Sequence, residues 1–456
     1  MRKIIFTLLI FVISSALMSQ TEVEGNQYGT WTTGNSPYLV IGQLVVPSGQ
    51  ILTIEPGVEI NFQGYFKFTV EGNLQALGTS SDSIFFTTDN SDIGWGGIRF
   101  DGSNGINNLN YCRIEFGKTS GEYPDIHGGA VALLGADAVF DNCTFADNNA
   151  NGENNGMGGA VYGINTGNPT KFTNCVFIRN YAYGEGGAVK FTSDLGTEFM
   201  KCSFQENNCL YGGGAISLYS VIGTQLNFCL FADNYTMYAD GGAIQTLGTG
   251  NTLFLNNCTL TENQSVTGDG GAINLAFANA SLVNCIIYNN SGMYSDDLNL
   301  AFGGDASINY CNSNIPDGAT GSNNITVNPE FEDASNQNYR LQAGSPCIDT
   351  GTDIGYEFIG AAPDMGCYEY GLPTIVIEKV SLNMLVYPNP AINILNVNNS
   401  LEIDNVIIYD MSGKVVLKQT FNNKSAIDIS SLKNGVYFTQ LIFKNSKVQS
   451  QKFIKQ

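Results

Sequence analysis

One pattern of residues returns along the middle of the chain and limits the folds that it can adopt. The copy that begins at Cys143 reads Cys-Thr-Phe-Ala-Asp-Asn and is followed by Gly-Gly-Ala-Val at 158–161. The cysteines that open successive copies are 31, 32, 27, 27, 29, 27 and 26 residues apart. The residues between them are typical of strands, and no copy shows the period of an amphipathic helix. A repeat of this length without helices predicts one coil of a β-solenoid per copy.

In a solenoid, each position of the repeat becomes a column along the axis, with ~4.8 Å between equivalent residues of neighbouring coils. The Cys and the Phe two residues later lie on the same side of a strand, so both are predicted to point inward. Cysteine packs as a small hydrophobic residue, which predicts a buried ladder of free thiols. Disulfides between neighbouring coils are the alternative. The column consists of Cys112, Cys143, Cys175, Cys202, Cys229, Cys258, Cys285 and Cys311.

A second column is made of asparagine. Asparagine tolerates the left-handed backbone conformation, and its amide can bond to the asparagine of the next coil. The column therefore predicts a structural ladder at a corner of the coil, with a ligand-binding role as the alternative. Its members are Asn148, Asn180, Asn207, Asn234, Asn263 and Asn290.

The residue before the ladder asparagine is acidic in several coils. Glu206, Asp233 and Glu262 would stack ~4.8 Å apart. Like charges at this distance repel by roughly 1 kcal/mol per pair even in water. Two interpretations remain open. Either the three carboxylates point into solvent, or a Ca²⁺ ion lies among them, because Ca²⁺ prefers clusters of oxygen ligands.

The paired signals Phe-x-x-Asn and Gly-Gly-Ala-Ile/Val resemble the repeats of polymorphic outer membrane proteins, over roughly residues 112–290. The resemblance implies an all-β fold, a right-handed parallel β-helix of the pectate-lyase-like kind. Proteins of this fold include adhesins, lyases and hydrolases, so the fold implies no single activity.

Both flanks of the repeat extend the predicted solenoid. Half-buried strands broken by Pro-Ser-Gly and Glu-Pro-Gly turns precede it. The β-helix is therefore expected over residues 20–345, with 20–40 as its first cap. Residues 346–370 resemble the closing segment of surface β-helices and are expected to cap the other end.

Two cysteines of this closing segment lie outside the repeat column. Cys347 and Cys367 are close in sequence, and disulfides are common in exported proteins. A disulfide between them is predicted, and two unpaired buried thiols are the alternative.

The N-terminus predicts export. Arg2 and Lys3 precede an apolar run, Ile4 to Ile13, that is too short to span a bilayer. Small and polar residues follow, so residues 1–19 are predicted to be a signal peptide. No transmembrane segment is expected in the mature chain.

Charge separates the C-terminal part from the rest. The chain has a net charge of -21, which argues against a nucleic-acid partner. Residues 384–456, however, contain eight Lys and four acidic residues. Such a shift marks a domain boundary, and residues 371–383 are expected to be a linker. Short alternating segments with Ser-Gly and Asn-Gly turns predict a small β-sandwich in the tail.

The order of motifs in the tail resembles the type A sorting domain of the type IX secretion system. The motifs are Tyr387-Pro-Asn-Pro390, Tyr409-Asp-Met-Ser-Gly-Lys414 and Leu432-Lys-Asn-Gly-Val-Tyr-Phe438. The resemblance implies passage through the type IX machinery and removal of the tail by its sortase. It also implies a final location outside the cell, secreted or attached to the outer-membrane surface, commonly by coupling to an anionic lipopolysaccharide.

No recognisable catalytic signature is present. The only histidine, His127, precedes a Gly-Gly corner and is expected to be a turn residue. Two functions compete. The favoured one is a non-enzymatic adhesin or surface protein that binds a polysaccharide or a host or cell-surface glycan. The alternative is a polysaccharide lyase or glycoside hydrolase. An enzyme should bring acids and a base together in a groove, whereas a binder should show aromatic or polar ladders. The candidate bases are Arg99, Arg113, Lys171, Arg179, Lys190 and Lys201.

Overall fold

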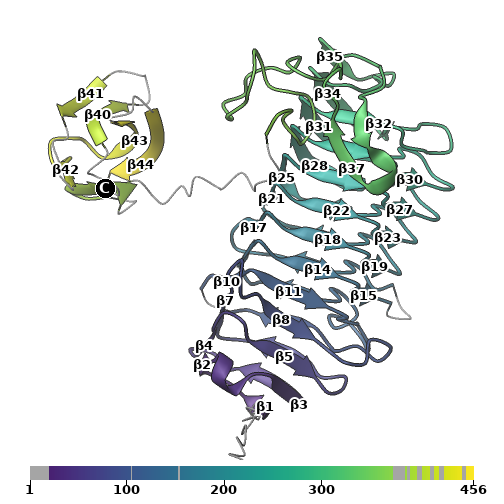
Figure 1. Cartoon of the computed structure of the whole chain (residues 1–456), viewed down its shortest axis with the longest axis vertical. Coiled ribbons are helices and arrows are strands. Elements are labelled where there is room, and N and C mark those ends of the chain that lie inside the picture. Colours follow the sequence, from purple (N-terminus) through teal and green to yellow (C-terminus); the bar gives the residue numbers. More distant parts are fainter. Residues whose placement is uncertain are drawn as a thin grey trace, which may run out of the picture. The chain divides into compact units, whose positions relative to one another are not determined.

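The computed structural model of the chain divides into two compact units, Met1–Gly371 and Leu372–Gln456, which are described separately (Figure 1). The predicted signal peptide and residues 373–383 of the predicted linker lie outside the described residues. The structure describes residues 20–103, 105–151, 155–372, 386–387, 391–397, 403–410, 415–420, 426–443 and 448–455.

The first unit is a parallel β-solenoid whose coils stack in register (Figure 1). Phe145 lies opposite Phe177 of the next coil, and Phe177 lies opposite Phe204 of the coil after that. Each coil crosses three faces, and the strands of one face pair only with the strands above and below them. This architecture confirms the predicted fold class.

The cysteine face carries the Cys-x-Phe part of each repeat. Its strands begin at the N-terminal end with β1 and include the first half of β3. They are β1 (Thr21–Asn26), β3 (Tyr38–Val46), β5 (Glu59–Phe62), β8 (Ile84–Thr87), β11 (Cys112–Glu115), β14 (Thr144–Ala146), β18 (Val176–Ile178), β22 (Ser203–Gln205), β26 (Leu230–Ala232), β29 (Thr259–Thr261) and β32 (Ile286–Tyr288).

The glycine face follows the Gly-Gly corner, and the third face follows the glycine face. Two long strands, β28 (Ile244–Asn256) and β31 (Ile273–Val283), run across both. The glycine face also has the end of β3 with β6 (Phe68–Val70), β9 (Ile98–Asp101), β12 (Val131–Leu134), β16 (Val161–Ile164), β20 (Val189–Thr192), β24 (Ile216–Tyr219) and β33 (Leu298–Ala301). The third face also has β2 (Gly29–Trp31), β4 (Ile51–Ile54), β7 (Asn73–Leu77), β10 (Asn107–Asn110), β13 (Ala138–Asp141), β17 (Thr170–Thr173), β21 (Thr197–Met200), β25 (Ile222–Asn227), β34 (Asp305–Asn309) and β35 (Thr320–Ser322).

Five coils contain a short fourth strand that the repeat pattern did not predict. These strands lie between the asparagine corner and the Gly-Gly corner and form a sheet of their own, the short sheet. Each has two residues, too few to show a strand period in the sequence. They are β15 (Asn149–Ala150), β19 (Tyr181–Ala182), β23 (Asn208–Cys209), β27 (Tyr235–Thr236) and β30 (Gln264–Ser265).

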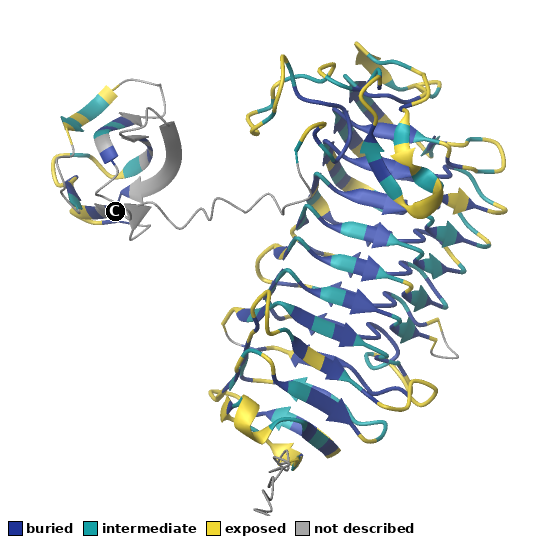
Figure 2. Cartoon of the chain, in the orientation of Figure 1, coloured by how far each residue is buried: buried dark blue, intermediate teal, exposed yellow. Residues whose placement is uncertain are grey.

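The inside of the solenoid is filled by stacked columns of buried side chains, and the ribbon of buried residues is dark blue in Figure 2. The rings of Phe145, Phe177, Phe204 and Phe231 stack with centroids 4.7, 4.6 and 4.6 Å apart. All eight thiols of the cysteine column are free and at most 2% exposed. Cys143 Sγ, for example, lies 3.2 Å from the Leu109 carbonyl. The prediction of an inward ladder of free thiols is confirmed.

The Gly-Gly corners need glycine for steric reasons. Gly186 has a φ of 68°, in the left-handed region. A Cβ on Gly187 would lie 2.1 Å from the carbonyl oxygen of Gly214, the equivalent glycine of the next coil. Any side chain at this position would push the coils apart.

The C-terminal end of the solenoid differs from the prediction, whereas the N-terminal end does not. Residues 20–40 were predicted to be the first cap of the β-helix. They contain β1, β2, the 3-10 helix η1 (Thr33–Asn35) and the start of β3, which together make the first coil. Residues 328–371, here called the return segment, contain β36 (Phe331–Asp333), η2 (Ala334–Asn336) and β37 (Asn338–Leu341).

The return segment lies along the side of the solenoid, where 346–370 was predicted to cap its end. Tyr339 and Cys367 pack on Leu230 and Ala232, two outward residues of β26 on the cysteine face. The reason is that these outward positions are apolar in this part of the face and would otherwise be exposed to water. The predicted β-helix boundary at 345 is therefore too late, because the return segment begins before it.

The second unit contains two antiparallel sheets that share one core, with Leu395, Val406, Ile427 and Leu441 among its residues. The arrangement agrees with the predicted small β-sandwich. No helix among the residues that the structure describes in either unit is long and apolar enough to cross a membrane. The sheets are β38 (Val386–Tyr387), β39 (Ile394–Val397) and β42 (Ala426–Asp428), and β41 (Val415–Thr420), β40 (Ile403–Asp410), β43 (Gly435–Phe443) and β44 (Val448–Lys455).

Candidate functional site

The asparagine column forms a continuous hydrogen-bonded ladder at the corner after the cysteine face. Asn180 Nδ2 donates to Asn207 Oδ1 at 2.9 Å and to the Phe145 carbonyl at 2.9 Å. The backbone N–H of Asn180 donates to the same Asn207 oxygen at 3.0 Å. The same bonds link Asn148, Asn234, Asn263 and Asn290 into the column. The side-chain amides are buried and used within the ladder, which gives the column a structural role.

The three acidic residues that precede ladder asparagines, here called the acidic column, point outward at the same corner, whereas the asparagines point inward. Glu206, Asp233 and Glu262 have φ angles of 55°, 57° and 58°, and their side chains are half-buried on the outside of the solenoid. The return segment covers them with two donors. Gln337 Nε2 donates to Glu206 at 2.9 Å and to Asp233 at 3.4 Å. The Tyr339 hydroxyl lies 3.4 Å from both Asp233 and Glu262.

The environment of the column disfavours the charged form of its carboxylates. Burial raises the pKa of Asp233, and the charge of Glu206 raises it further. Burial and the charge of Asp233 likewise raise the pKa of Glu262. The carboxylates therefore do not point freely into solvent but bond to the return segment. In the described part of the chain, no group of three or more His, Cys, Asp or Glu is placed to hold a metal. The geometry gives the calcium hypothesis no support.

The structure forms no disulfide between Cys347 and Cys367, and both thiols are free and buried. They belong to different apolar clusters of the return segment. Asn312 Nδ2 donates to Cys347 Sγ at 3.3 Å, whereas the N–H of Cys367 donates to Thr259 Oγ1 at 3.0 Å. Two coils of the solenoid, separated by the coil of Ile286, thus hold the two thiols apart. The structure has two unpaired buried thiols in place of the predicted disulfide.

Five of the six candidate bases are held in ion pairs, and two of them, Arg99 and Lys190, also lie within electrostatic reach of His127. Lys190, on β20, pairs with Glu185 and donates to Ser217 Oγ at 3.1 Å. Ser217 also donates to Glu185 at 2.9 Å, so the three side chains satisfy one another. Burial lowers the pKa of the half-buried Lys201. The other ion pairs are Arg99–Asp125, Arg113–Glu115, Lys171–Glu198 and Arg179–Asp147.

His127 has a structural position at the Gly-Gly corner. Its Nδ1 accepts the Met157 N–H at 3.1 Å, and its ring stacks on Tyr162 with centroids 4.4 Å apart. Burial, together with the charges of Arg99 and Lys190, lowers the pKa of His127 to about 4. The ring is therefore neutral at neutral pH.

A ladder of tyrosines stands on the outside of the solenoid, on the loops that follow β19, β23 and β27. The ring centroids of Tyr183 and Tyr211 are 6.1 Å apart, and those of Tyr211 and Tyr238 are 5.9 Å apart. Tyr211 is 42% exposed and Tyr238 is 57% exposed. We call these three residues the tyrosine ladder. It offers ring edges and faces, with a hydroxyl on each ring, to a ligand that runs along the solenoid axis.

Reasoning from the sequence missed this ladder. A signal was present, because the three tyrosines are 28 and 27 residues apart, close to the 27 residues that separate the cysteines of the same coils. The tyrosines follow the short strands that the repeat pattern did not predict, so no column had been assigned to their positions.

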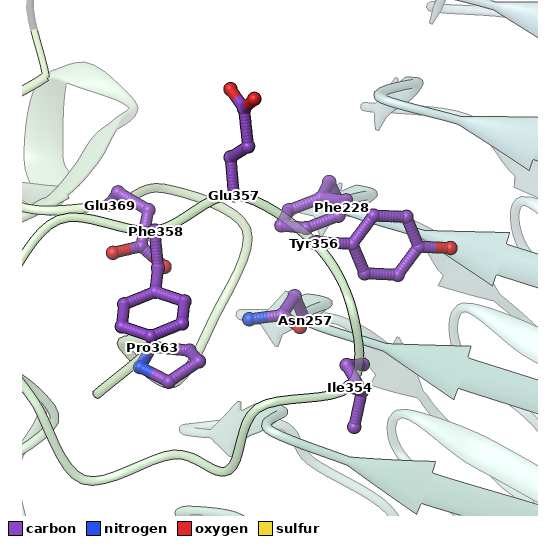
Figure 3. A pocket seen from close by; sticks show the side chains of 8 residues that line it. All are labelled: Phe228, Asn257, Ile354, Tyr356, Glu357, Phe358, Pro363 and Glu369. Atoms are coloured by element: carbon purple, nitrogen blue, oxygen red, sulfur yellow. The ribbon is translucent and has the colours of Figure 1, made fainter. Parts of the chain in front are cut away.

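Two pockets lie beside the return segment. In the first, Phe228 of the solenoid meets Tyr356 edge to face at 4.9 Å, and Figure 3 shows Phe358 next to Pro363. This pocket encloses no space for a water molecule, so its side chains serve to hold the return segment. The second pocket is larger, with a volume of about 350 Å³, and lies next to Glu262. No Lys, Arg or His lines either pocket.

Residues 385–456 match the family model of the secretion system C-terminal sorting domain. The chain carries a type IX secretion sorting domain. The protein is therefore exported by the type IX system to the cell surface or the extracellular space. The match agrees with the predicted tail of 384–456. Parts of the motifs that first indicated the sorting domain, including 388–390 and 411–414, lie outside the described residues.

The chain is similar to a solved structure, a crystal structure of pectate lyase Pel9A. The identity is 15%, the match covers 71% of this chain and 88% of that one, and the TM-score is 0.26. A likeness at this level carries no argument about activity. No curated protein was found to match the chain.

Proposed function

We propose that the exported protein is a non-enzymatic glycan-binding protein that acts at the cell surface or in the extracellular space. The tyrosine ladder carries this proposal. It presents three aromatic rings at intervals of 6.1 and 5.9 Å on the outside of the solenoid. Buried aromatic rings are expected in any core, but aligned exposed ones mark an interaction surface.

The spacing of the ladder favours an extended polymer. The C–H faces of a sugar ring pack against aromatic rings, and its hydroxyls bond to tyrosine hydroxyls. With one tyrosine per coil, successive rings can contact successive sugar residues of a chain parallel to the axis. Because the tyrosines are carried by a solenoid whose coils are tightly stacked, the backbone loses little entropy when a chain binds. A polysaccharide or a cell-surface glycan is therefore the proposed ligand.

The sorting domain supports a role at the cell surface or in the extracellular space. Removal of the tail by the sortase and coupling to lipopolysaccharide are part of the proposal, as is a role in adhesion. The repeats resemble those of polymorphic outer membrane proteins, which is consistent with a surface role.

The test is a polysaccharide panel on which the secreted protein is scored for both binding and cleavage. We expect binding without cleavage. The double variant Tyr211→Ala/Tyr238→Ala should weaken binding by about tenfold or more, which is the loss of ~1.4 kcal/mol. Tyr28→Ala is the matched control, because Tyr28 is 62% exposed in the first coil, away from the ladder. Cleavage of any polymer, or equal binding by the double variant, would overturn the proposal.

A further inference from the structure

The second pocket is built by three segments that are distant in sequence. One coil contributes Thr261 and Glu262, the next contributes Tyr288 and Asn289, and the return segment forms the remaining wall. The volume of about 350 Å³ falls within the range of small-ligand sites. Neither the repeat nor the return segment could form this pocket alone.

The chemistry of the lining suits a neutral polyhydroxylated group. Tyr288 and Phe331 supply aromatic surface, and Asn289 and Gln342 supply amides. Glu262 and Glu330 add carboxylates that can accept hydrogen bonds from hydroxyls. The absence of Lys, Arg and His from the lining disfavours an anion, because the carboxylates would repel it.

Hydrogen bonds within the return segment hold this wall in place. Gln342 Nε2 donates to the Phe331 carbonyl at 2.8 Å, and the Gln342 N–H donates to the Glu330 carbonyl at 2.9 Å. The Glu330 N–H donates to Asn328 Oδ1 at 3.0 Å. The amide of Gln342 has a further N–H and an acceptor oxygen beyond the bond to Phe331. The wall is thus ordered before a ligand arrives.

We propose that this pocket binds the terminal sugar residue of a neutral glycan, while the tyrosine ladder binds the interior of a chain. The inference rests on the proposed function and adds a second, separate site to it. The pocket should accept a free monosaccharide. The ladder gives useful affinity only to polymers, because each ring contributes a small share of the binding energy.

The experiment measures monosaccharide binding to the secreted protein by saturation-transfer NMR and calorimetry. The panel is glucose, galactose, mannose and N-acetylglucosamine. Ala334→Phe fills the pocket without removing a polar contact, and Gln342→Ala removes one donor. We expect both variants to weaken monosaccharide binding by about tenfold or more. Tyr238→Ala should leave the affinity for the monosaccharide within about twofold of the parent. Protection of the Cys367 thiol from labelling shows that the return segment stays in place in each variant.

The outcomes separate the two proposals. If no sugar of the panel binds, or if both pocket variants bind it as the parent does, the pocket is not a sugar site. Polymer binding that still depends on the ladder would leave the proposed function intact in that case. If monosaccharide binding is lost in the pocket variants but no polymer depends on the tyrosines, the pocket stands and the ladder proposal fails.

Discussion

The asparagine ladder and the tyrosine ladder run along the same coils of one solenoid, yet they differ in burial and in hydrogen bonding. Asn207 is fully buried, and its amide bonds to the coils on both sides at 2.9–3.0 Å. Tyr211, four residues later, is 42% exposed and contacts its neighbours in the ladder only through tilted rings. The asparagine ladder forms its hydrogen bonds within the protein, whereas the tyrosine ladder exposes its rings and hydroxyls to solvent.

This difference shows how function can be recognised in a repeat. In a solenoid, any residue type favoured by the repeat becomes a column, so recurrence alone does not separate structure from function. The two are separated by whether the polar groups of the column have hydrogen-bond partners within the protein. A buried column whose donors and acceptors pair with each other maintains the coil, whereas an exposed aromatic column has surface available for a partner. The two ladders should therefore respond to substitution in opposite ways.

The largest effect is expected where the buried ladder is interrupted. Asn207→Ala would remove the acceptor of the Asn180 N–H and of one Asn180 Nδ2 bond, and the donor to the Phe177 carbonyl and Asn234 Oδ1. An unsatisfied buried group costs about 1–3 kcal/mol and each further lost bond about 1 kcal/mol, so the free energy of unfolding should fall by roughly 2–4 kcal/mol. Urea titration measures it, with Asn208→Ala on the short sheet as control. A loss below ~1 kcal/mol would contradict the structural role of the ladder.

A somewhat smaller loss is expected at the Gly-Gly corner. In Gly187→Ala the new Cβ would lie 2.1 Å from the Gly214 carbonyl oxygen, which is backbone and cannot rotate away. The coils must separate locally, at a cost of about 1–3 kcal/mol. Gly34→Ala is the control, since the nearest atom to its Cβ is 3.8 Å away. Equal midpoints for both variants in urea would show that the corner has room for a side chain.

The sequence was sufficient to predict the columns, because stacking in a solenoid makes the interval visible without any structure. Cys143, Phe145 and Asn148 were assigned to their columns from spacing alone, and the sorting domain was found from motif order. What the sequence did not reveal is contact between distant segments. Nothing in the spacing of Glu206, Asp233 and Glu262 indicates that Tyr339 and Gln337 of the return segment would cover them.

The same reason explains the other errors. Cys347 and Cys367 are close in sequence, but the solenoid coil under each of them differs, and packing on Ile286 and Leu230 decides where the thiols lie. The short strands were missed because two residues carry no period, and the tyrosine ladder was missed with them. The local sequence pattern determines the conformation of each coil. The environment of the outward residues depends instead on which distant segment packs against them.

The third prediction concerns a carboxylate that is buried, as the asparagine ladder is, but is not fully hydrogen-bonded. Glu369 is 7% exposed, and its Oε2 has no hydrogen-bond partner, unlike the amides of the asparagine ladder. Burial first, and then the charge of Asp364, raises the pKa of Glu369 from 4.5 to about 7. Because the folded state holds the proton more tightly than the unfolded state, stability should be highest below pH 4.5 and fall as the pH rises to about 7.

Glu369→Gln should remove this loss. At pH 7.5 we expect the variant to be more stable than the parent by about 1–2 kcal/mol, after allowance for solvent screening. Thermal unfolding between pH 4 and pH 8 measures the effect, and Glu71→Gln serves as the control because Glu71 is exposed. If both variants follow the parent's pH profile, the carboxylate is solvated and the contrast with the buried ladder does not extend to it.

The smallest effect on stability is expected at the tyrosine ladder, and this result completes the comparison. Tyr211→Ala removes a ring that is 42% exposed and makes no backbone bond through its side chain in the described contacts. Substitutions at such surface positions change stability by about 0.5 kcal/mol or less. The urea midpoint should therefore remain near that of the parent, although polysaccharide binding falls. If Tyr211→Ala instead destabilised the solenoid as much as Asn207→Ala, the tyrosines would be a second structural ladder. Any loss of binding would then follow from unfolding. Tyr183→Phe distinguishes these cases further, because it keeps the ring that packs in the ladder and removes only the hydroxyl that a glycan would contact.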